Sequence, residues 1–160
     1  MGLPLKVDGQ NADGTFDGFD DAPDIVQLYH STAQAVAVGQ VAYLADDATN
    51  GRGKSSIVAV TTDDAAMACG FFLESRAATD PAGFIPVQVS GIYDGAINTS
   101  GSQIEFGSML GADVSVTGGV KTAANPTGLL WPFCQSLDVV ASGAGATIPV
   151  GIIPKSWFKV

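Results

Sequence analysis

Short apolar runs, each interrupted after a few residues by Gly, Pro, Asn or Asp, fill the chain from residue 25 onward. They are rich in Val, Ile, Phe and Tyr, and no long segment repeats its apolar residues at helical spacing. β-Branched and aromatic residues favour strands, and the interrupting residues favour turns. The pattern predicts an all-β fold over residues 25–160, a small antiparallel β-barrel or sandwich, with these candidate strands: Ile25–Tyr29, Val36–Leu44, Ile57–Thr61, Gly70–Glu74, Ile85–Tyr93, Gln103–Phe106, Asp113–Thr117, Val120–Thr122, Gly128–Gln135 and Ile148–Ile153.

Turn-forming pairs set several of the strand boundaries. Asp94-Gly95 and Ser100-Gly101 are expected to close strands, and Gly118-Gly119 fits a two-residue hairpin whose residues need positive φ. The run Val87-Gln88-Val89-Ser90 alternates apolar and polar residues, which places its two valines on one face of a strand. We therefore expect one buried face and one face that is wet or shared with a neighbour.

Residues 1–24 form a separate acidic, Gly-rich stretch that holds six of the 16 acidic residues. The stretch predicts an extended N-terminal arm. Its aromatic residues, Phe16 and Phe19, fit either an arm that folds onto a partner or a surface loop held to the domain. The segment Asp13–Asp24 has part of a calcium-loop spacing, but Thr15 at its third position and an Asp in place of Glu at its twelfth argue against a metal site.

The segment Thr147–Pro154 is apolar on both faces. Its two prolines cannot donate to a ladder, so the segment is predicted to be an edge strand. Such a strand fits either a barrel rim or a subunit interface that contains Ile148, Val150 and Ile152. Near the C-terminal end of the sequence, Trp157-Phe158 would either plug the barrel or anchor an interface.

The charge balance excludes one class of partner. The chain has 7 Lys and Arg against 16 Asp and Glu, a net charge of −9, so it offers no basic surface to a nucleic-acid backbone. Only 14% of its residues are charged and 46% are hydrophobic. A free monomer usually keeps a more charged surface. We expect neighbours to cover part of this one, although a lightly charged extracellular-type domain would have a similar composition.

The cysteines and the start of the sequence bear on the compartment. Cys69 and Cys134 lie in apolar runs, which is typical of buried free thiols in a reducing compartment, although a single disulfide stays open. Met1–Lys6 has one positive charge and no apolar segment after it, so no secretory signal is expected. No apolar stretch is long enough to span a bilayer. These features predict synthesis in the cytoplasm and no membrane partner.

Residues that could carry out catalysis are few. His30 is the only histidine, its neighbours form no nucleophile elbow, and Gly-x-Ser-x-Gly does not occur. One His and two separated Cys give no zinc cluster. The run Gly51–Ser55 has the wrong spacing for a phosphate-binding loop. We predict a non-enzymatic chain with no catalytic residue, cofactor or metal, in which His30 is structural or lies on the surface.

Several phrases of the sequence follow one another in a family-like order. Val36–Leu44 reads Val-x-x-Gly-x-Val-x-x-Leu, Ile85–Tyr93 is a Val-rich strand followed by Gly and an apolar residue, and Ile104–Gly111 contains a Gly-x-x-Leu turn. Cys134–Leu137 and Ala141–Val150 would be the closing pair of strands. In this order the segments resemble the capsid decoration, or head-stabilising, proteins of tailed phages, of the trimeric β-barrel type.

The resemblance covers residues 33–154 and rests on spacing and residue type. It implies a protein of the virion capsid surface, made in the host cytoplasm, that binds the outside of an assembled capsid as a homotrimer. There it would clamp neighbouring subunits of the major capsid protein against internal DNA pressure, with no enzymatic step. The residues expected to face a partner are Phe16, Phe19, Ile148, Val150, Ile152, Trp157 and Phe158.

Two other functions fit an all-β chain of this composition. A receptor- or carbohydrate-binding domain of a head or tail fibre would need an exposed aromatic platform, for which Tyr93 and Trp131–Phe133 are candidates; the leucines before Trp131 indicate a core position instead. A trimeric nucleotide hydrolase would need basic residues for phosphate beside a Gly-rich loop, and those residues are missing.

Overall fold

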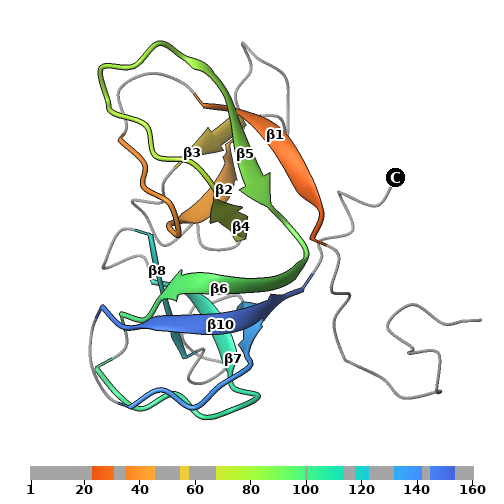
Figure 1. Ribbon diagram of the computed structural model, residues 1–160, viewed down its shortest axis with the longest axis vertical. Coiled ribbons are helices and arrows are strands. Elements are labelled where there is room, and N and C mark those ends of the chain that lie inside the picture. The colour runs from red at the N-terminus through yellow and green to blue at the C-terminus, as the bar shows by residue number, and fades with distance from the viewer. Residues whose placement is uncertain are drawn as a thin grey trace, which may run out of the picture.

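The computed structural model of the chain describes residues 23–30, 35–45, 55–57, 68–99, 101–113, 118–122, 132–141 and 145–153. These ranges contain ten β-strands and no helix, so the all-β prediction is confirmed. The strands form two groups of five consecutive strands (Figure 1). We call strands β1 to β5 the barrel module and strands β6 to β10 the second module.

The barrel module closes on itself. Its strands are β1 (Ile25–His30), β2 (Val41–Ala45), β3 (Ser55–Ile57), β4 (Ala68–Phe72) and β5 (Gly83–Gln88). They follow one another in the order β1-β3-β2-β4-β5, and β5 pairs with β1 to complete the barrel. The β1–β3 pairing is parallel and the other pairings are antiparallel. Closure removes the exposed sheet edges that other chains could extend.

The second module is a five-stranded sheet. Its strands are β6 (Gly91–Ile97), β7 (Met109–Asp113), β8 (Gly119–Thr122), β9 (Pro132–Ser136) and β10 (Thr147–Ile152), in the order β6-β10-β9-β7-β8. Beyond β6, Asn98 forms a parallel bridge with Val120 of β8, and the Thr99 N–H donates to the Val120 carbonyl at 2.9 Å. This contact brings the two outer strands of the sheet together.

The two modules repeat one connectivity, which the sequence analysis did not detect. In each, the first strand is antiparallel to the fifth and parallel to the third, the second is antiparallel to the third and fourth, and the fourth is antiparallel to the fifth. An irregularity between Ala42 and Tyr43 in the β2–β4 ladder recurs between Leu110 and Gly111 in the β7–β9 ladder. Strands β1 to β5 therefore correspond, in order, to β6 to β10.

The correspondence extends to single residues. Each module has an apolar residue in an isolated bridge, Val36 or Ile104, and three residues later a glycine with positive φ, Gly39 (87°) or Gly107 (79°). In both turns the residue after the glycine donates its N–H at 3.1 Å to the carbonyl two residues before the glycine. Positive φ at the third position of such a turn explains why glycine recurs there.

An Ile-Pro-Val run lies at the same place in both fifth strands, as Ile85–Val87 in β5 and Ile148–Val150 in β10. The carbonyl of Pro86 accepts a hydrogen bond from the N–H of Leu73 at 3.0 Å, and the carbonyl of Pro149 accepts one from the N–H of Leu137 at 2.9 Å. Equivalent residues thus make equivalent bonds across the two halves, as in an internal duplication.

The prediction that Thr147–Pro154 is an edge strand is wrong. Strand β10 pairs with β6 on one side and with β9 on the other. Its register with β6 shifts between Ile148 and Val150, so the ladder does not require an N–H from Pro149. A bulge therefore admits the proline to an interior strand.

Each module has a core with its own division of large and small residues. The barrel encloses Leu28, Val36, Ala42, Leu44, Cys69, Phe72, Ile85, Val87 and Val89. Ala42 and Leu44 of β2 correspond to Leu110 and Ala112 of β7, so the large and the small residue exchange places. Such exchanges keep the packed volume of a core similar.

Strand β2 is buried on both faces and joins the modules. Val41 and Tyr43 belong to the core cluster that also contains the buried residues of the second module. From β4, the ring of Phe71 stacks on Tyr93 of β6 at 4.7 Å and lies 5.4 Å from the ring of Phe133 of β9. We call the contact of Val41, Tyr43 and Phe71 with the second module the junction.

The two longest predicted strands are each divided by a turn. Val36–Leu44 is interrupted before β2 begins, and Ile85–Tyr93 bends between β5 and β6, where Gly91 has a φ of 78°. At that bend Gln88 and Ser90 are only 5% and 6% exposed, so the expectation of a wet or shared face is wrong for them. Asp94-Gly95 lies inside β6, so it does not form the predicted turn; Gly118 lies in a turn with a φ of 83°, as predicted, but Gly119 already belongs to β8. Of Gln103–Phe106, only Ile104 enters a bridge.

Candidate partner-binding surfaces

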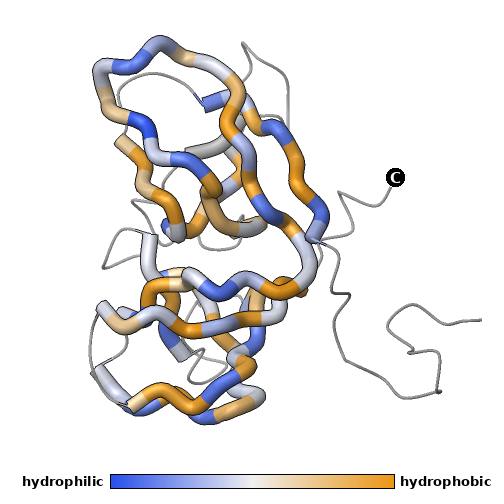
Figure 2. Tube along the Cα trace, in the orientation of Figure 1, coloured by the Kyte–Doolittle hydropathy of each residue, from blue (hydrophilic) through white to orange (hydrophobic). Residues whose placement is uncertain are grey.

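The outer surface of the β1–β5 ladder combines apolar exposure with a lack of charge. Its outward residues, which we call the β1–β5 face, are Ile25, Gln27 and Tyr29 of β1 and Phe84 and Pro86 of β5. Ile25 is 53% exposed and Phe84 is 64% exposed. Figure 2 shows both apolar and polar residues along these two strands. Large apolar residues gathered on a surface mark interaction sites.

Tyr29 and Phe84 form the aromatic centre of the β1–β5 face. Their rings meet edge to face, with centroids 5.8 Å apart and an interplanar angle of 81°. Beside them the Arg76 guanidinium donates to the carbonyls of Pro81 at 3.2 Å and Phe84 at 2.9 Å. The arginine thereby holds the backbone from which the Phe84 ring extends into solvent.

Asp24, just before β1, fixes the bend between the two modules. Its carboxylate accepts a hydrogen bond from the Ser90 hydroxyl, and its carbonyl accepts one from the Val89 N–H, both at 2.9 Å. The Gln88 side-chain amide donates to the carbonyls of Ser90 at 3.0 Å and Ile92 at 2.8 Å. These bonds explain why two polar side chains are buried there, and they hold the β1–β5 face in a fixed position on the molecule.

A second apolar surface lies at the end of the second module that faces away from the barrel. Phe106, Met109 and Val139 are 69%, 39% and 50% exposed. The segments that carry Phe106 and Val139 are joined by the bridge between Ile104 and Val140, and they run side by side at the lower end of the molecule (Figure 1). We call Phe106, Met109 and Val139 the distal face.

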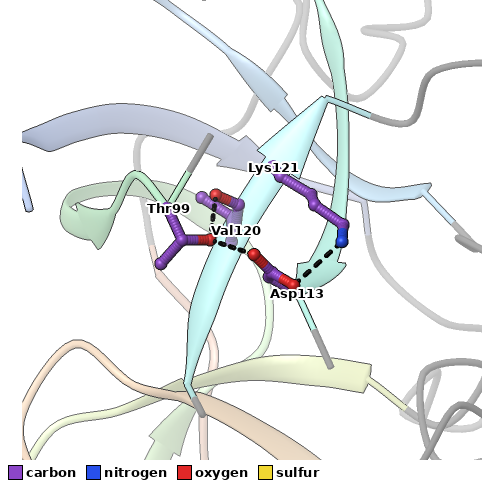
Figure 3. A network of polar contacts seen from close by, with 4 residues as sticks. All are labelled: Thr99, Asp113, Val120 and Lys121. Carbon is purple, nitrogen blue, oxygen red and sulfur yellow. Dashed lines mark hydrogen bonds and ion pairs between the residues drawn. The ribbon is translucent and has the colours of Figure 1, made fainter. Parts of the chain in front are cut away.

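The second module also contains a largely buried ion pair. The Asp113 side chain is 4% exposed and accepts hydrogen bonds from Lys121 Nζ at 2.9 Å and Thr99 Oγ1 at 2.7 Å (Figure 3). The same hydroxyl lies 3.2 Å from the Val120 carbonyl. The partners come from β7, β8 and the end of β6, so the network fastens the outer strands of the sheet. We assign it a structural role.

The histidine and both cysteines of the chain are buried. His30 is 1% exposed, and its ring packs edge-on against Phe72 at 5.8 Å. Cys69 and Cys134 are buried free thiols, as predicted. Burial raises the pKa of the Cys134 thiol far above its usual range, which keeps it protonated and unreactive. Within the ranges that the structure describes, no group of three or more His, Cys, Asp and Glu side chains could hold a metal ion.

The predicted interface residues of β10 are core residues instead. Ile148, Val150 and Ile152 are 0% exposed and pack within the second module, so they do not reach the surface. The prediction failed because it took an apolar segment with prolines for an edge strand, whereas β10 is an interior one. Phe16, Phe19, Trp157 and Phe158 lie outside the described residues, and their assignment to an interface stays a prediction.

Sequence reasoning missed Phe84 and Phe106. The signal for Phe84 was its parity: Ile85 and Val87 point into the barrel, so the residue before them must point outward. Phe106 is the second residue of a turn whose third is a glycine, a position that faces solvent. Tyr93 is not an open platform, because it is half-buried against Phe71, and desolvation raises the pKa of its hydroxyl.

Comparison with protein-family models finds no match to this chain, and comparison with curated proteins finds none either. Among the described residues, no helix has the length and apolar character needed to cross a membrane. The site assignments above therefore rest on the geometry of the chain itself.

Proposed function

We propose that the chain is a structural virion protein, a decoration protein that binds the outside of an assembled tailed-phage capsid as a homotrimer and clamps neighbouring subunits of the major capsid protein. The observation that carries this proposal is the β1–β5 face, an exposed apolar surface without charge on a closed barrel. The burial of His30 and both thiols is consistent with a binding role.

The β1–β5 face suits a protein partner on physical grounds. Phe84 and Ile25 are more than half exposed, and covering apolar area contributes about 25 cal/mol per Å². The five side chains that define the face carry no charge, and the adjacent Arg76 guanidinium already donates to two backbone carbonyls, so docking over the face buries mainly uncharged groups. Aromatic residues near the centre of an interface often dominate its binding energy. We therefore assign the capsid-binding role to this face, with Tyr29 and Phe84 at its centre.

The second candidate function, carbohydrate or receptor binding, is favoured by one observation, the exposed aromatic pair of Tyr29 and Phe84. Their rings stand at 81° to each other, so they do not form one flat platform for a sugar ring. The polar side-chain groups of this face are the Gln27 amide and the Tyr29 hydroxyl, whereas sugar sites combine stacking with several polar groups that converge to fix orientation. The geometry fits a protein surface better.

The test is cosedimentation of the purified chain with expanded empty shells of its cognate tailed phage. We expect saturable binding, and we expect Phe84→Asp to weaken it by more than about tenfold, because the variant places a charge at the centre of an apolar contact. Val38→Asp is the matched control, since Val38 is a 52% exposed apolar residue outside the β1–β5 face. Binding of immobilised glycans without binding of shells would favour the second candidate, and equal binding by both variants would refute the assignment of the face.

A further inference from the structure

The duplication identifies what the distal face corresponds to in the barrel module. By register, Met109 of β7 occupies the place of Val41 of β2, because each pairs with the equivalent residue of the neighbouring strand, Gln135 or Phe71. Phe106 is the residue before the turn glycine, as Val38 is in the barrel module. Of the distal face, Met109 therefore lies in the second module's copy of the junction surface, and Phe106 lies at its rim, as the 52% exposed Val38 does in the barrel module.

That surface is covered in one module and open in the other. Val41 is 0% exposed at the junction, whereas Met109 is 39% exposed. A Cβ placed on Gly39 would lie 2.7 Å from the carbonyl oxygen of Gly95, because the turn presses against β6. A Cβ on Gly107 would meet only the Gln135 amide nitrogen, at 3.7 Å. The second module thus presents a junction surface with nothing packed against it in the described chain.

The polar residues of the distal surface are already bonded within the second module. Gln135, which replaces Phe71, donates from its amide to the Gly107 carbonyl at 2.9 Å. Lys121, which replaces Ile57 in the ladder, is bound to Asp113 at 2.9 Å. A partner that covers this surface would leave these groups paired, so it would not incur the cost of an unsatisfied polar atom. What remains for contact is the apolar set Phe106, Met109 and Val139, flanked by two exposed carboxylates, Glu105 and Asp138, that accept hydrogen bonds from Gln103 and the Val139 N–H.

We propose that the distal face binds a second copy of this chain, and that the contact repeats between chains the junction that joins the two modules within one chain. The occupant of the equivalent surface is a module of this same fold, and the second copy supplies another such module. A contact of this kind is head-to-tail, and it closes into a ring when the rotation between copies permits. This inference rests on the proposed function, which supplies the expected copy number of three, and it adds the surface through which the copies would meet.

The experiment measures the mass of the full chain by light scattering and sedimentation velocity over a range of concentrations. The unmodified chain is expected to assemble. Met109→Asp is expected to weaken assembly by more than about tenfold, since a carboxylate would be buried against an apolar module, and Phe106→Asp, at the rim, is expected to weaken it less. Val38→Asp, at the equivalent turn of the barrel module, is the matched control and should assemble normally. Thermal unfolding of each variant checks the fold, which changes at exposed positions should preserve.

The outcomes separate this inference from the proposed function. A monomeric unmodified chain, or a Met109→Asp variant that assembles as the unmodified chain does, would overturn the inference. A Met109→Asp variant that stays assembled but no longer binds shells would also overturn the inference, because the distal face would then contact the capsid. Assembly that depends on Met109 in a chain that does not bind shells would support the inference and remove the proposed function.

Discussion

Truncation of Phe71 to alanine tests the junction more sharply than any other single change. The Phe71 ring is 0% exposed and lies against Tyr93 and Phe133, both of which belong to the second module. The substitution removes these contacts from β4 without altering a strand pairing. Gln135→Ala changes the equivalent position of the second module, where the side chain is partly exposed and makes one hydrogen bond, to Gly107.

The expected magnitude follows from burial. Removing a fully buried phenylalanine side chain costs about 3–5 kcal/mol, of which each aromatic contact accounts for about 0.5–1.5 kcal/mol beyond the buried area. We expect Phe71→Ala to lower the free energy of unfolding by about 4 kcal/mol. In a chain of 160 residues this corresponds to a fall in Tm of about 8–16 °C. Gln135→Ala should cost about 1 kcal/mol, the usual value of one hydrogen bond.

Urea unfolding followed by circular dichroism measures both variants, and calorimetry gives the two Tm values. A loss below about 1 kcal/mol for Phe71→Ala, or a loss no larger than that of Gln135→Ala, would show that the modules do not pack through this ring. The reasoning that links the distal face to the junction would then have no basis.

Two further predictions concern the junction turn and alkaline pH. Gly39→Ala and Gly107→Ala should each lower the free energy of unfolding by about 1 kcal/mol, because both residues have positive φ. Gly39→Ala should cost at least about 1 kcal/mol more, since its Cβ would lie 2.7 Å from the Gly95 carbonyl oxygen. Equal losses in urea unfolding would contradict this prediction. Burial raises the pKa of the Cys134 thiol above its ordinary 9.0 and that of the Tyr93 hydroxyl above 10.0, so the unfolded chain loses these protons first as pH rises. Stability should therefore fall from about pH 9 upward, by at most about 1.4 kcal/mol per pH unit for each group, and Cys134→Ala should flatten the fall; an unchanged slope would refute the assignment.

The fold class could be predicted from the sequence because it depends on local patterns. The β-branched runs and the glycines between them mark strands and turns wherever the strands finally pair. Strand boundaries were less well determined. The bend at Gly91 depends in part on the hydrogen bond between Ser90 and Asp24, which lie 66 residues apart, and no local sequence pattern indicates that contact.

The duplication leaves only a few recognisable traces in the sequence. The Ile-Pro-Val runs that begin at Ile85 and Ile148, and the turn glycines Gly39 and Gly107, are its clearest traces. Between them the cores exchange large and small residues, as Leu44 and Ala112 do. Such exchanges preserve packing and erase identity, so the repeat becomes evident when the strand pairings are compared.

The interface residues were harder to predict because apolar character alone does not separate a core strand from a contact strand. Ile148 and Val150 are apolar and buried, whereas Phe84 and Phe106 are apolar and exposed. Which of the two applies depends on the pairing of β10 and on the direction of each side chain, and both are properties of the assembled sheets.

The most direct test of the proposed function is the melting temperature of expanded empty capsid shells, measured by calorimetry with and without the purified chain. A protein that clamps neighbouring capsid subunits binds the intact shell better than its separated subunits, so it must raise that temperature. We predict a rise that saturates with added chain and disappears with Phe84→Asp. Shells that melt at the same temperature at every concentration of the unmodified chain would contradict the account.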